Sequence, residues 1–472
     1  MAPQGTRMTN WRWWICSLLF VATTVNYLDR QVLSLTYKEF ISPEFGWTDA
    51  DYGTITSFFS IFYAIVSLFA GKFVDWMGVK KGYIIAIGVW SAGACLHALC
   101  GVGTAAIVGR TALAVSTVSV YLFLACRGIL ALGESGNFPA AIKVTAEYFP
   151  KKDRAFATSI FNAGASVGAL AAPLCIPPLA KAFGWEMAFI IIGSIGFIWM
   201  FLWAFLYDTP TKSRHVNEAE LSYIAQDAGE EESHAHKDSK EDEKSIPFFK
   251  CFRYRQTWSF IAGKFFTDGV WWFFLFWAPA YFQDQFGAAA SSGLGQALIF
   301  TLYAIVTAVS IFGGYLPKIF VDRLGMKPYS GRMLAMLIFA FLPVAALFAQ
   351  PLGINLHSAW WPAILIGIAG AGHQAWSANL YSTIGDMFPK STIASITGIG
   401  TMAGGIGSML VQKIAGNLFT YAENAGSAFT FLGFEGKPAG YSIVFCYCGI
   451  AYVLAWCIMK ILVPKYKPVE TR

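Results

Sequence analysis

The sequence predicts an all-α polytopic membrane protein with twelve transmembrane helices in two pseudo-symmetric bundles of six, both termini lying in the cytoplasm. Three observations support this prediction. Of the 472 residues, 56% are hydrophobic and only 13% are charged, whereas roughly 25% charged residues are usual in soluble domains. Twelve long apolar segments follow one another along the chain, and basic residues gather in alternate loops between them.

The apolar segments are long enough to cross a bilayer, because a hydrocarbon core of about 30 Å takes roughly 20 helical residues. A polar stretch at 208–256 separates six of them from the other six, so we expect bundles at 1–207 and 257–472 joined by a cytoplasmic linker. In chain order, the segments cover 13–40, 50–74, 82–101, 118–148, 155–183, 187–207, 257–284, 294–320, 332–351, 358–388, 392–421 and 440–463.

Basic residues mark one side of the membrane. They follow the second, fourth, eighth and tenth segments and end the chain, whereas the opposite loops hold mainly acids such as Glu39, Asp49 and Asp284. By the positive-inside rule, the basic side is cytoplasmic. No cleavable signal peptide is expected, since arginines and tryptophans lead directly into the first apolar run. The linker is acidic, and we expect a short surface helix in it followed by solvated chain.

The two halves repeat short motifs at equivalent places. Gly71, Asp75 and Gly78 follow the second segment, and Asp322 and Arg323 follow the eighth. The fourth and tenth segments both end in an acid followed closely by Phe-Pro-Lys. Parallel repeats of this kind place a ligand site near the bilayer midplane, between halves that rock against each other.

Away from the segment ends, the intramembrane charges are Asp29, Arg30, Arg127, Glu134, Lys264 and Asp268. Each costs about 3 kcal/mol or more at membrane depth unless it faces protein or water, so the group marks a transport pathway. A buried structural ion pair is the alternative. Arg127 and Glu134 point from one face of the helix predicted at 118–148. Because the three bases and three acids cancel, protonating two acids would free positive charge for an anionic substrate.

These motifs resemble those of the major facilitator superfamily. The loops with Asp75 and Asp322 are similar to its cytoplasmic motif, with one departure at Trp76, where a basic residue is usual. The stretches at 26–30 and 127–139 resemble the signatures of its branch of anion:cation symporters. Within that branch, the stretches at 265–279 and 372–380 are most similar to hexuronate transporters. The resemblance implies proton-coupled uptake of glucuronate or galacturonate by a multi-pass protein of the bacterial inner membrane.

The branch resemblance also implies residue roles. It assigns Arg30 to the substrate carboxylate, for which a planar guanidinium is well suited. It assigns Asp29 and Glu134 to proton coupling. Arg127 is then expected to pair with Glu134 or Asp29 when these are ionised.

A uronate ring needs neutral donors and acceptors and an aromatic wall. Lys264 is a further candidate for substrate binding, with Asp268 relaying charge, or the two form only a local salt bridge one turn apart. His373 could equally be a substrate ligand or a core histidine with partners inside the protein. The neutral candidates are Tyr27, Tyr63, Asn162, His373, Gln374, Trp376, Ser377 and Asn379.

Other functions stay open. The substrate could be another organic anion, such as an aldonate, a sialic acid or a dicarboxylate, and the coupling ion could be sodium. A sugar-acid sensor would bind without transport. The intramembrane residues offer no paired metal ligands, activated nucleophile or phosphate loop, which argues against an enzyme. We expect no metal or cofactor, a monomer, and partners limited to a sugar acid, protons and the lipid bilayer, without nucleic acid.

Overall fold

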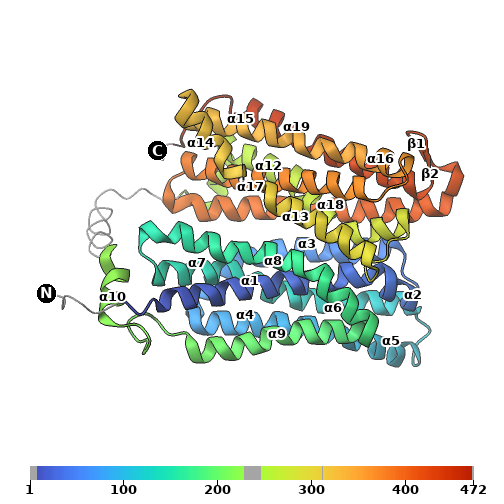
Figure 1. Cartoon of the computed structure of the whole chain (residues 1–472), viewed down its shortest axis with the longest axis horizontal. Helices are drawn as coiled ribbons and strands as arrows, with labels where there is room; N and C mark the ends of the chain where they lie inside the picture. The colour runs from blue at the N-terminus through green and yellow to red at the C-terminus, as the bar shows by residue number, and fades with distance from the viewer. Residues whose placement is uncertain (1–7, 228–245, 311, 470–472) are drawn as a thin grey trace.

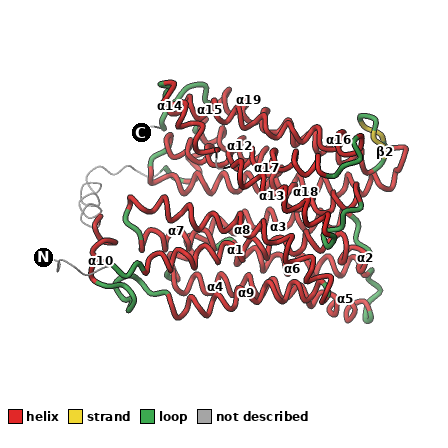
Figure 2. Tube along the Cα trace, viewed as in Figure 1, coloured by secondary structure: helices red, strands yellow, loops and turns green. Residues whose placement is uncertain are grey.

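The computed structural model of the chain describes residues 8–227, 246–310 and 312–469. Almost all of this described chain is helical. Two short antiparallel strands, β1 (Thr430–Phe431) and β2 (Phe434–Glu435), form a hairpin in the stretch between residues 425 and 437. Figure 2 shows that short loops join the helices.

The helices lie side by side in two groups, and both chain termini lie at one end of the molecule (Figure 1). We call this the terminal end and the opposite one the far end. The first helix group contains α1 (Trp11–Thr36), α2 (Ser42–Phe45), α3 (Asp49–Met77), α4 (Val79–Leu96), α5 (Cys100–Val108), α6 (Val115–Glu134), α7 (Asn137–Tyr148), α8 (Lys151–Phe183) and α9 (Trp185–Leu206).

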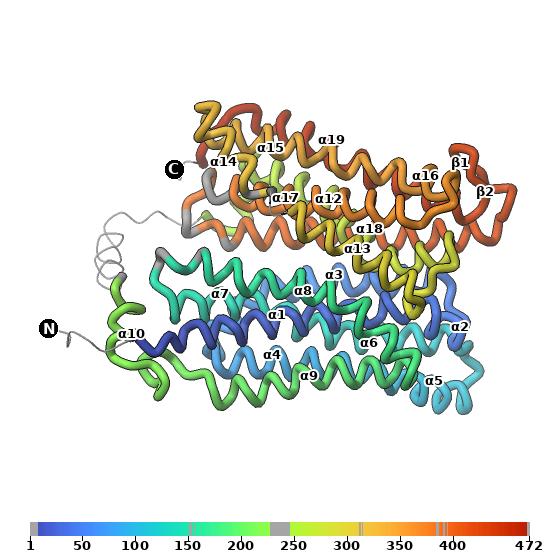
Figure 3. Tube along the Cα trace, in the orientation of Figure 1, coloured from blue at the N-terminus to red at the C-terminus, as the bar shows by residue number. Residues whose placement is uncertain are grey.

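The second helix group follows the linker, as the colour change from green to yellow and red shows in Figure 3. It contains α12 (Arg255–Phe286), α13 (Gly293–Ser310), α14 (Phe312–Leu324), α15 (Pro328–Phe341), α16 (Ala349–Asn355), α17 (Trp360–Met387), α18 (Lys390–Ala425) and α19 (Lys437–Leu462). Short helical turns connect some of these, among them η1 (Tyr37–Ile41), η2 (His97–Leu99), η4 (Phe248–Arg253) and η5 (Leu342–Phe348).

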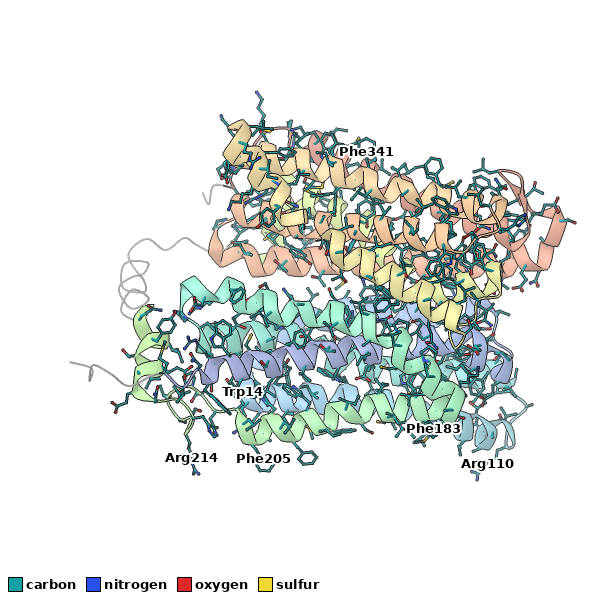
Figure 4. All side chains as sticks on the ribbon, viewed as in Figure 1. Trp14, Arg110, Phe183, Phe205, Arg214 and Phe341 are labelled. Carbon is teal, nitrogen blue, oxygen red and sulfur yellow. The ribbon has the colours of Figure 1, made fainter. Side chains whose placement is uncertain are left out.

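Eight helical segments of the described chain are long and apolar enough to span a membrane. Four further long helices, α1, α12, α17 and α18, are interrupted by polar and charged residues. Large aromatic side chains point outward from the helices, including Phe183, Phe205 and Phe341 (Figure 4). Phe205 is 81% exposed, which suits a surface in contact with lipid.

The prediction of one unbroken helix at 118–148 is wrong. That segment consists of α6, which ends at Glu134, and α7, which begins at Asn137. Pro139 explains the break, because it has no N–H to donate to the carbonyl of Ser135 and its ring crowds that carbonyl. The segments predicted at 82–101 and 332–351 are likewise interrupted, by the helical turns η2 and η5. The segment predicted at 294–320 contains α13 and α14, and residue 311 between them lies outside the described residues.

The linker is docked on the terminal end of the first helix group through the short helix α10 (Glu218–Ile224). The surface helix expected there is present, but its Glu220 is fully buried rather than solvated. The Glu220 carboxylate accepts the backbone N–H groups of Trp11 and Arg12 at 3.0 and 3.1 Å. It also lies 3.2 Å from the Arg12 guanidinium. Glu220 thereby caps α1, whose own N-cap residue makes no side-chain bond.

The other end of the linker is fixed to the second helix group. The backbone N–H of Ile246 donates to Thr392 Oγ1 at 3.2 Å, and Thr257 Oγ1 donates to the Cys251 carbonyl at 2.6 Å. The solvated part expected at 229–244 lies outside the described residues.

Gly133 lets α6 approach α4 closely just before the acid at Glu134. A Cβ atom at Gly133 would lie 2.5 Å from the carbonyl oxygen of Ala86 and 2.7 Å from Cβ of Trp90. Both neighbours are part of a packed helix, so neither can move away cheaply.

We therefore predict that Gly133→Val lowers the free energy of unfolding by about 1–3 kcal/mol, the usual cost of overpacking a buried contact. Gly293→Val is the matched control, because a Cβ there would meet nothing within 4 Å. Thermal unfolding of both variants in detergent measures the difference. Equal melting temperatures would contradict the close packing of α4 and α6.

Candidate functional site

A buried ion pair joins α1 to α6. Arg30 Nη2 lies 2.8 Å from Glu134 Oε2, and Arg30 Nε donates to the same oxygen at 3.0 Å. The two residues are 5% and 1% exposed. The expected pair of Arg127 with Glu134 or Asp29 is not among the ion pairs of the described residues, where Glu134 meets Arg30 instead. Arg127 and Glu134 lie seven residues apart on one helix, which is about 10 Å of rise, whereas Arg30 reaches across from a neighbouring helix.

Aromatic rings surround the Arg30 guanidinium. Its Cζ lies 5.2 Å from the ring centre of Tyr27 and 4.9 Å from that of Tyr63. Phe59 and Trp272 contribute rings at 5.7 and 5.3 Å. Three of the rings come from the first helix group, but Trp272 comes from α12 of the second. Arg30 therefore lies at the seam between the groups, with the stabilisation that a cation gains over ring faces.

Asp29 lies next to Arg30 in the chain, about 100° further around α1, and Trp90, Glu134 and Arg127 are its polar neighbours. It is 1% exposed, and neither of its carboxylate oxygens has a hydrogen-bond partner in the described structure. Two neighbouring polar atoms are also unpaired, Oε1 of Glu134 and Nη1 of Arg127. The guanidinium of Arg127 lies 5.4 Å from the ring centre of Phe59. Four ionisable groups thus share one buried region with only one ion pair among them.

The second helix group holds its own charge pair. Lys264 Nζ lies 2.6 Å from Asp268 Oδ2, one turn along α12. The salt bridge weighed as an alternative is therefore present. Lys264 also lies 4.9 Å from the ring centre of Tyr381 on α17. Lys264, Asp268 and Trp272 follow a spacing of four, so they line one face of α12.

Most of the α17 candidates have partners inside the second helix group. His373 Nδ1 lies 2.8 Å from the Tyr452 hydroxyl, and its ring stacks on Trp271 with centroids 5.5 Å apart. Trp376 is fully buried and packs edge-on against Tyr452, at 5.6 Å between ring centroids. Asn379 Nδ2 donates to the carbonyls of Gly313 and Ala375 at 2.9 and 2.8 Å. His373, Trp376 and Asn379 therefore pack in the core of the second helix group.

For three other candidates the structure gives no side-chain hydrogen bond. Asn162 is exposed on α8, and Gln374 and Ser377 are partly buried on α17. Among the residues that the structure describes, no group of three or more His, Cys, Asp or Glu side chains is arranged to hold a metal ion.

The repeated loop motifs lie at the terminal end. Gly78 joins α3 to α4 with φ +76°, a conformation that favours glycine. Asp75 pairs with Lys143 of α7 at 2.7 Å, and Trp76 beside it is 80% exposed. Gly71 is in the last turns of α3, and Asp322 and Arg323 are exposed on the last turn of α14.

A second set of charges, which the sequence analysis did not single out, closes the far end. This far-end cluster contains Lys38, Asp49, Asp284 and Lys437. Lys437 Nζ lies 2.5 Å from Asp49 and 2.6 Å from Asp284, and Lys38 Nζ lies 3.3 and 3.1 Å from the same two carboxylates. Each group contributes one lysine and one aspartate, so the cluster joins the two helix groups.

Hydrogen bonds continue this junction along the far-end part of α3. The Tyr52 hydroxyl donates to the Phe276 carbonyl at 2.8 Å. The backbone N–H of Ala50 donates to Thr420 Oγ1 at 2.8 Å, and the Ser408 hydroxyl donates to Ser60 Oγ at 3.0 Å.

Comparison with known proteins gives consistent matches over most of the chain. The Escherichia coli (strain K12) hexuronate transporter is 28% identical over 408 residues, which are 86% of this chain and 87% of that protein. The Dickeya chrysanthemi galacturonate transporter is 26% identical over 344 residues, which are 72% and 92% of the two chains.

The fold matches that of a bacterial homologue of the human lysosomal transporter Spinster in its inward-facing, unoccupied conformation. The TM-score is 0.70 at 17% sequence identity, over 98% of this chain and 100% of the other.

The family model described as Major Facilitator Superfamily matches residues 19–412. With its membrane-spanning helices, the chain is a multi-pass transporter of the bacterial inner membrane and not an enzyme. Its sequence and its fold agree on this point, and the chain belongs to the major facilitator superfamily.

Proposed function

We propose that this transporter takes up a hexuronate, glucuronate or galacturonate, together with protons by alternating access. The observation that carries the proposal is the Arg30–Glu134 pair, buried among aromatic rings at the seam between the helix groups. The similarity to hexuronate and galacturonate transporters supports this substrate class.

Proton and substrate exchange places at Arg30. While Glu134 is ionised, its carboxylate holds the guanidinium fork that a substrate carboxylate would need. Protonation of Glu134 removes that competitor, and the substrate carboxylate then accepts the same donors in a bidentate pair. Tyr27, Tyr63 and Trp272 provide ring faces for the apolar side of the sugar and hydroxyl or indole donors for its hydroxyls.

Asp29 supplies a second proton site. An ionised carboxylate that is buried without hydrogen bonds is expensive, so we place a proton on Asp29 in the arrangement described here, with Arg127 as the nearby cation that accommodates its ionised form. One proton only cancels the roughly 2.3 kcal/mol per 100 mV that opposes entry of a monoanion. A second proton would drive accumulation.

Lys264 and Asp268 serve the other end of the substrate. Their face of α12 continues from Trp272, so they point along the same seam as Arg30. Asp268 Oδ1 is buried and unpaired, and a sugar hydroxyl could donate to it. We assign no substrate contact to Asn162, Gln374 or Ser377 beyond their place on α8 and α17.

The two helix groups act as rocking bundles of six transmembrane helices, 1–207 and 257–472, joined by the linker at 208–256, with both termini in the cytoplasm. The bonds between the groups gather at the far end, on α3 residues 50–60 and in the far-end cluster. This supports a conformation closed on the outside, as the positive-inside orientation of the loops places the far end there. The transporter acts as a monomer.

Uptake of labelled glucuronate, galacturonate and gluconate into proteoliposomes tests the substrate assignment. We expect Arg30→Ala to lower hexuronate uptake by at least about 30-fold, because truncating one partner of a buried charged pair costs about 2 kcal/mol or more. Arg110→Ala, at an exposed arginine of the first helix group, is the control and should transport normally. Faster uptake of gluconate than of either uronate would contradict the substrate class.

Proton coupling is tested by imposing a pH gradient or a sodium gradient on the same vesicles. Glu134→Gln leaves Arg30 without its ionised competitor, so we expect uptake driven by the pH gradient to fall to the level without a gradient while exchange of labelled for unlabelled substrate continues. Asp29→Asn should lower gradient-driven accumulation in the same way. Uptake by the unaltered protein that follows sodium and ignores pH would overturn both assignments.

The far-end cluster should control which end is open. Lys437→Ala leaves Asp49 and Asp284 with Lys38 as their remaining partner in the cluster, so repulsion between the carboxylates favours separation of the groups. We expect a cysteine at Ser60, which is 1% exposed, to react several-fold faster with a membrane-impermeant maleimide in that variant. Lys413→Ala is the control, since exposed Lys413 donates only one bond to Thr54 across the seam. Unchanged labelling after Lys437→Ala would rule out this role.

A further inference from the structure

An apolar pocket opens on the surface of the second helix group, away from the seam. Its volume is about 300 Å³, which is at the small end of ligand pockets. On α12 it is lined by Trp258, Ala262, Phe265 and Phe266, and on α19 by Ile458 and Leu462. At 100° per residue, its centre lies about a third of a turn around α12 from the face of Lys264 and Asp268.

The pocket runs along the membrane normal for about one leaflet. From Trp258 to Phe266 the rise is about 12 Å, and half of a typical hydrocarbon core is about 15 Å. One bond between α12 and α19, and one between α12 and η4, hold its walls. The Tyr447 hydroxyl of α19 donates to the Phe266 carbonyl at 3.0 Å at the deep end, and the Trp258 indole donates to the Phe252 carbonyl at 2.8 Å at the rim.

Basic side chains border the rim at the terminal end. Arg255, the first residue of α12, is exposed and shares one helix face with Trp258, Ala262 and Phe266 at spacings of three, four and four. Lys250 and Arg253 are exposed on η4, just before it. The described stretch 246–258 contains no acid.

Aromatic residues next to these bases place the rim at the membrane interface. Phe249 is 84% exposed, Phe248 40% and Trp258 48%. Rings as exposed as these would be costly in water, but they are typical of the belt where headgroups meet the hydrocarbon core. The C-terminal tail crosses the same place, because Gln256 Nε2 donates to the Lys467 carbonyl at 2.8 Å. The exposed Lys467 adds positive charge there.

We propose that this pocket binds one anionic phospholipid of the adjacent leaflet. An acyl chain lies along the apolar wall between α12 and α19, and the phosphate lies over Trp258, where Arg255 donates to it. Lys250, Arg253 and Lys467 supply the surrounding positive potential. The apolar wall matches an acyl chain, and the basic rim matches an anionic headgroup at the depth of the membrane interface. A phospholipid with net negative charge has both features.

The test measures lipid binding to the purified full-length protein in detergent by native mass spectrometry. Dioleoyl phosphatidylglycerol and dioleoyl phosphatidylcholine are titrated separately, with inorganic phosphate as a competitor. We expect phosphatidylglycerol to bind more tightly and Arg255→Gln to weaken only that lipid, by about fivefold, the share of one basic residue near an anionic surface. Phosphate should not compete, because it lacks the acyl chains.

Filling the pocket tests the apolar half of the proposal separately. Ala262→Phe should lower binding of both lipids, whereas Ile461→Phe, at a 76% exposed position of α19 outside the pocket, should not. Arg214→Gln, at an exposed arginine of the linker near the terminal end (Figure 4), is the control for charge. Equal affinity for the two lipids, or phosphatidylglycerol binding that survives both Arg255→Gln and Ala262→Phe, would overturn the proposal. Loss of phosphatidylglycerol binding in the two control variants would do the same.

Discussion

Charges buried inside a lipid-spanning bundle must find partners within the protein, and this constraint organises the structure around Arg30. Its guanidinium is held by Glu134 and surrounded by four rings, one of which comes from the opposite helix group. In the proposed mechanism, every Arg30 donor that is committed to Glu134 is withheld from the substrate. The cost of burying these charges therefore also couples them, since a partner can leave only when another arrives or a proton replaces it.

The two ends of the seam are built differently. At the far end, lysines and aspartates from both groups alternate within about 3 Å of one another, and tyrosine and serine hydroxyls continue the contact along α3. At the terminal end, the ion pair of the repeated loop motif, Asp75 with Lys143, lies within the first group alone. Such an arrangement allows the groups to part at one end while the other holds, which is what rocking about a central site requires.

Charged positions in apolar runs were predictable from sequence, because polarity within a membrane span is visible residue by residue. Their pairing was not. Arg30 and Glu134 are 104 positions apart, and whether Arg127 or Arg30 meets Glu134 depends on how α1 packs against α6. The spacing of Trp272 from Lys264 predicts that the two side chains share one face of α12. The contact between Trp272 and Arg30 could not be predicted, because it depends on how the two helix groups pack together. The sequence shows Asp49 and Asp284 only as acids of the loops opposite the basic side, since nothing local distinguishes a loop acid that a distant lysine will bury.

The linker is divided between the halves that it connects. Residues up to 227 are tied to the first helix group through Glu220, and residues from 246 onward are tied to the second through Thr392. The boundary between the two helix groups thus falls within the linker and not at either of its ends. A transporter expressed as two separate polypeptides, cut between 228 and 245, would keep every contact described at both new termini, so reassembly of the halves would depend on the seam alone.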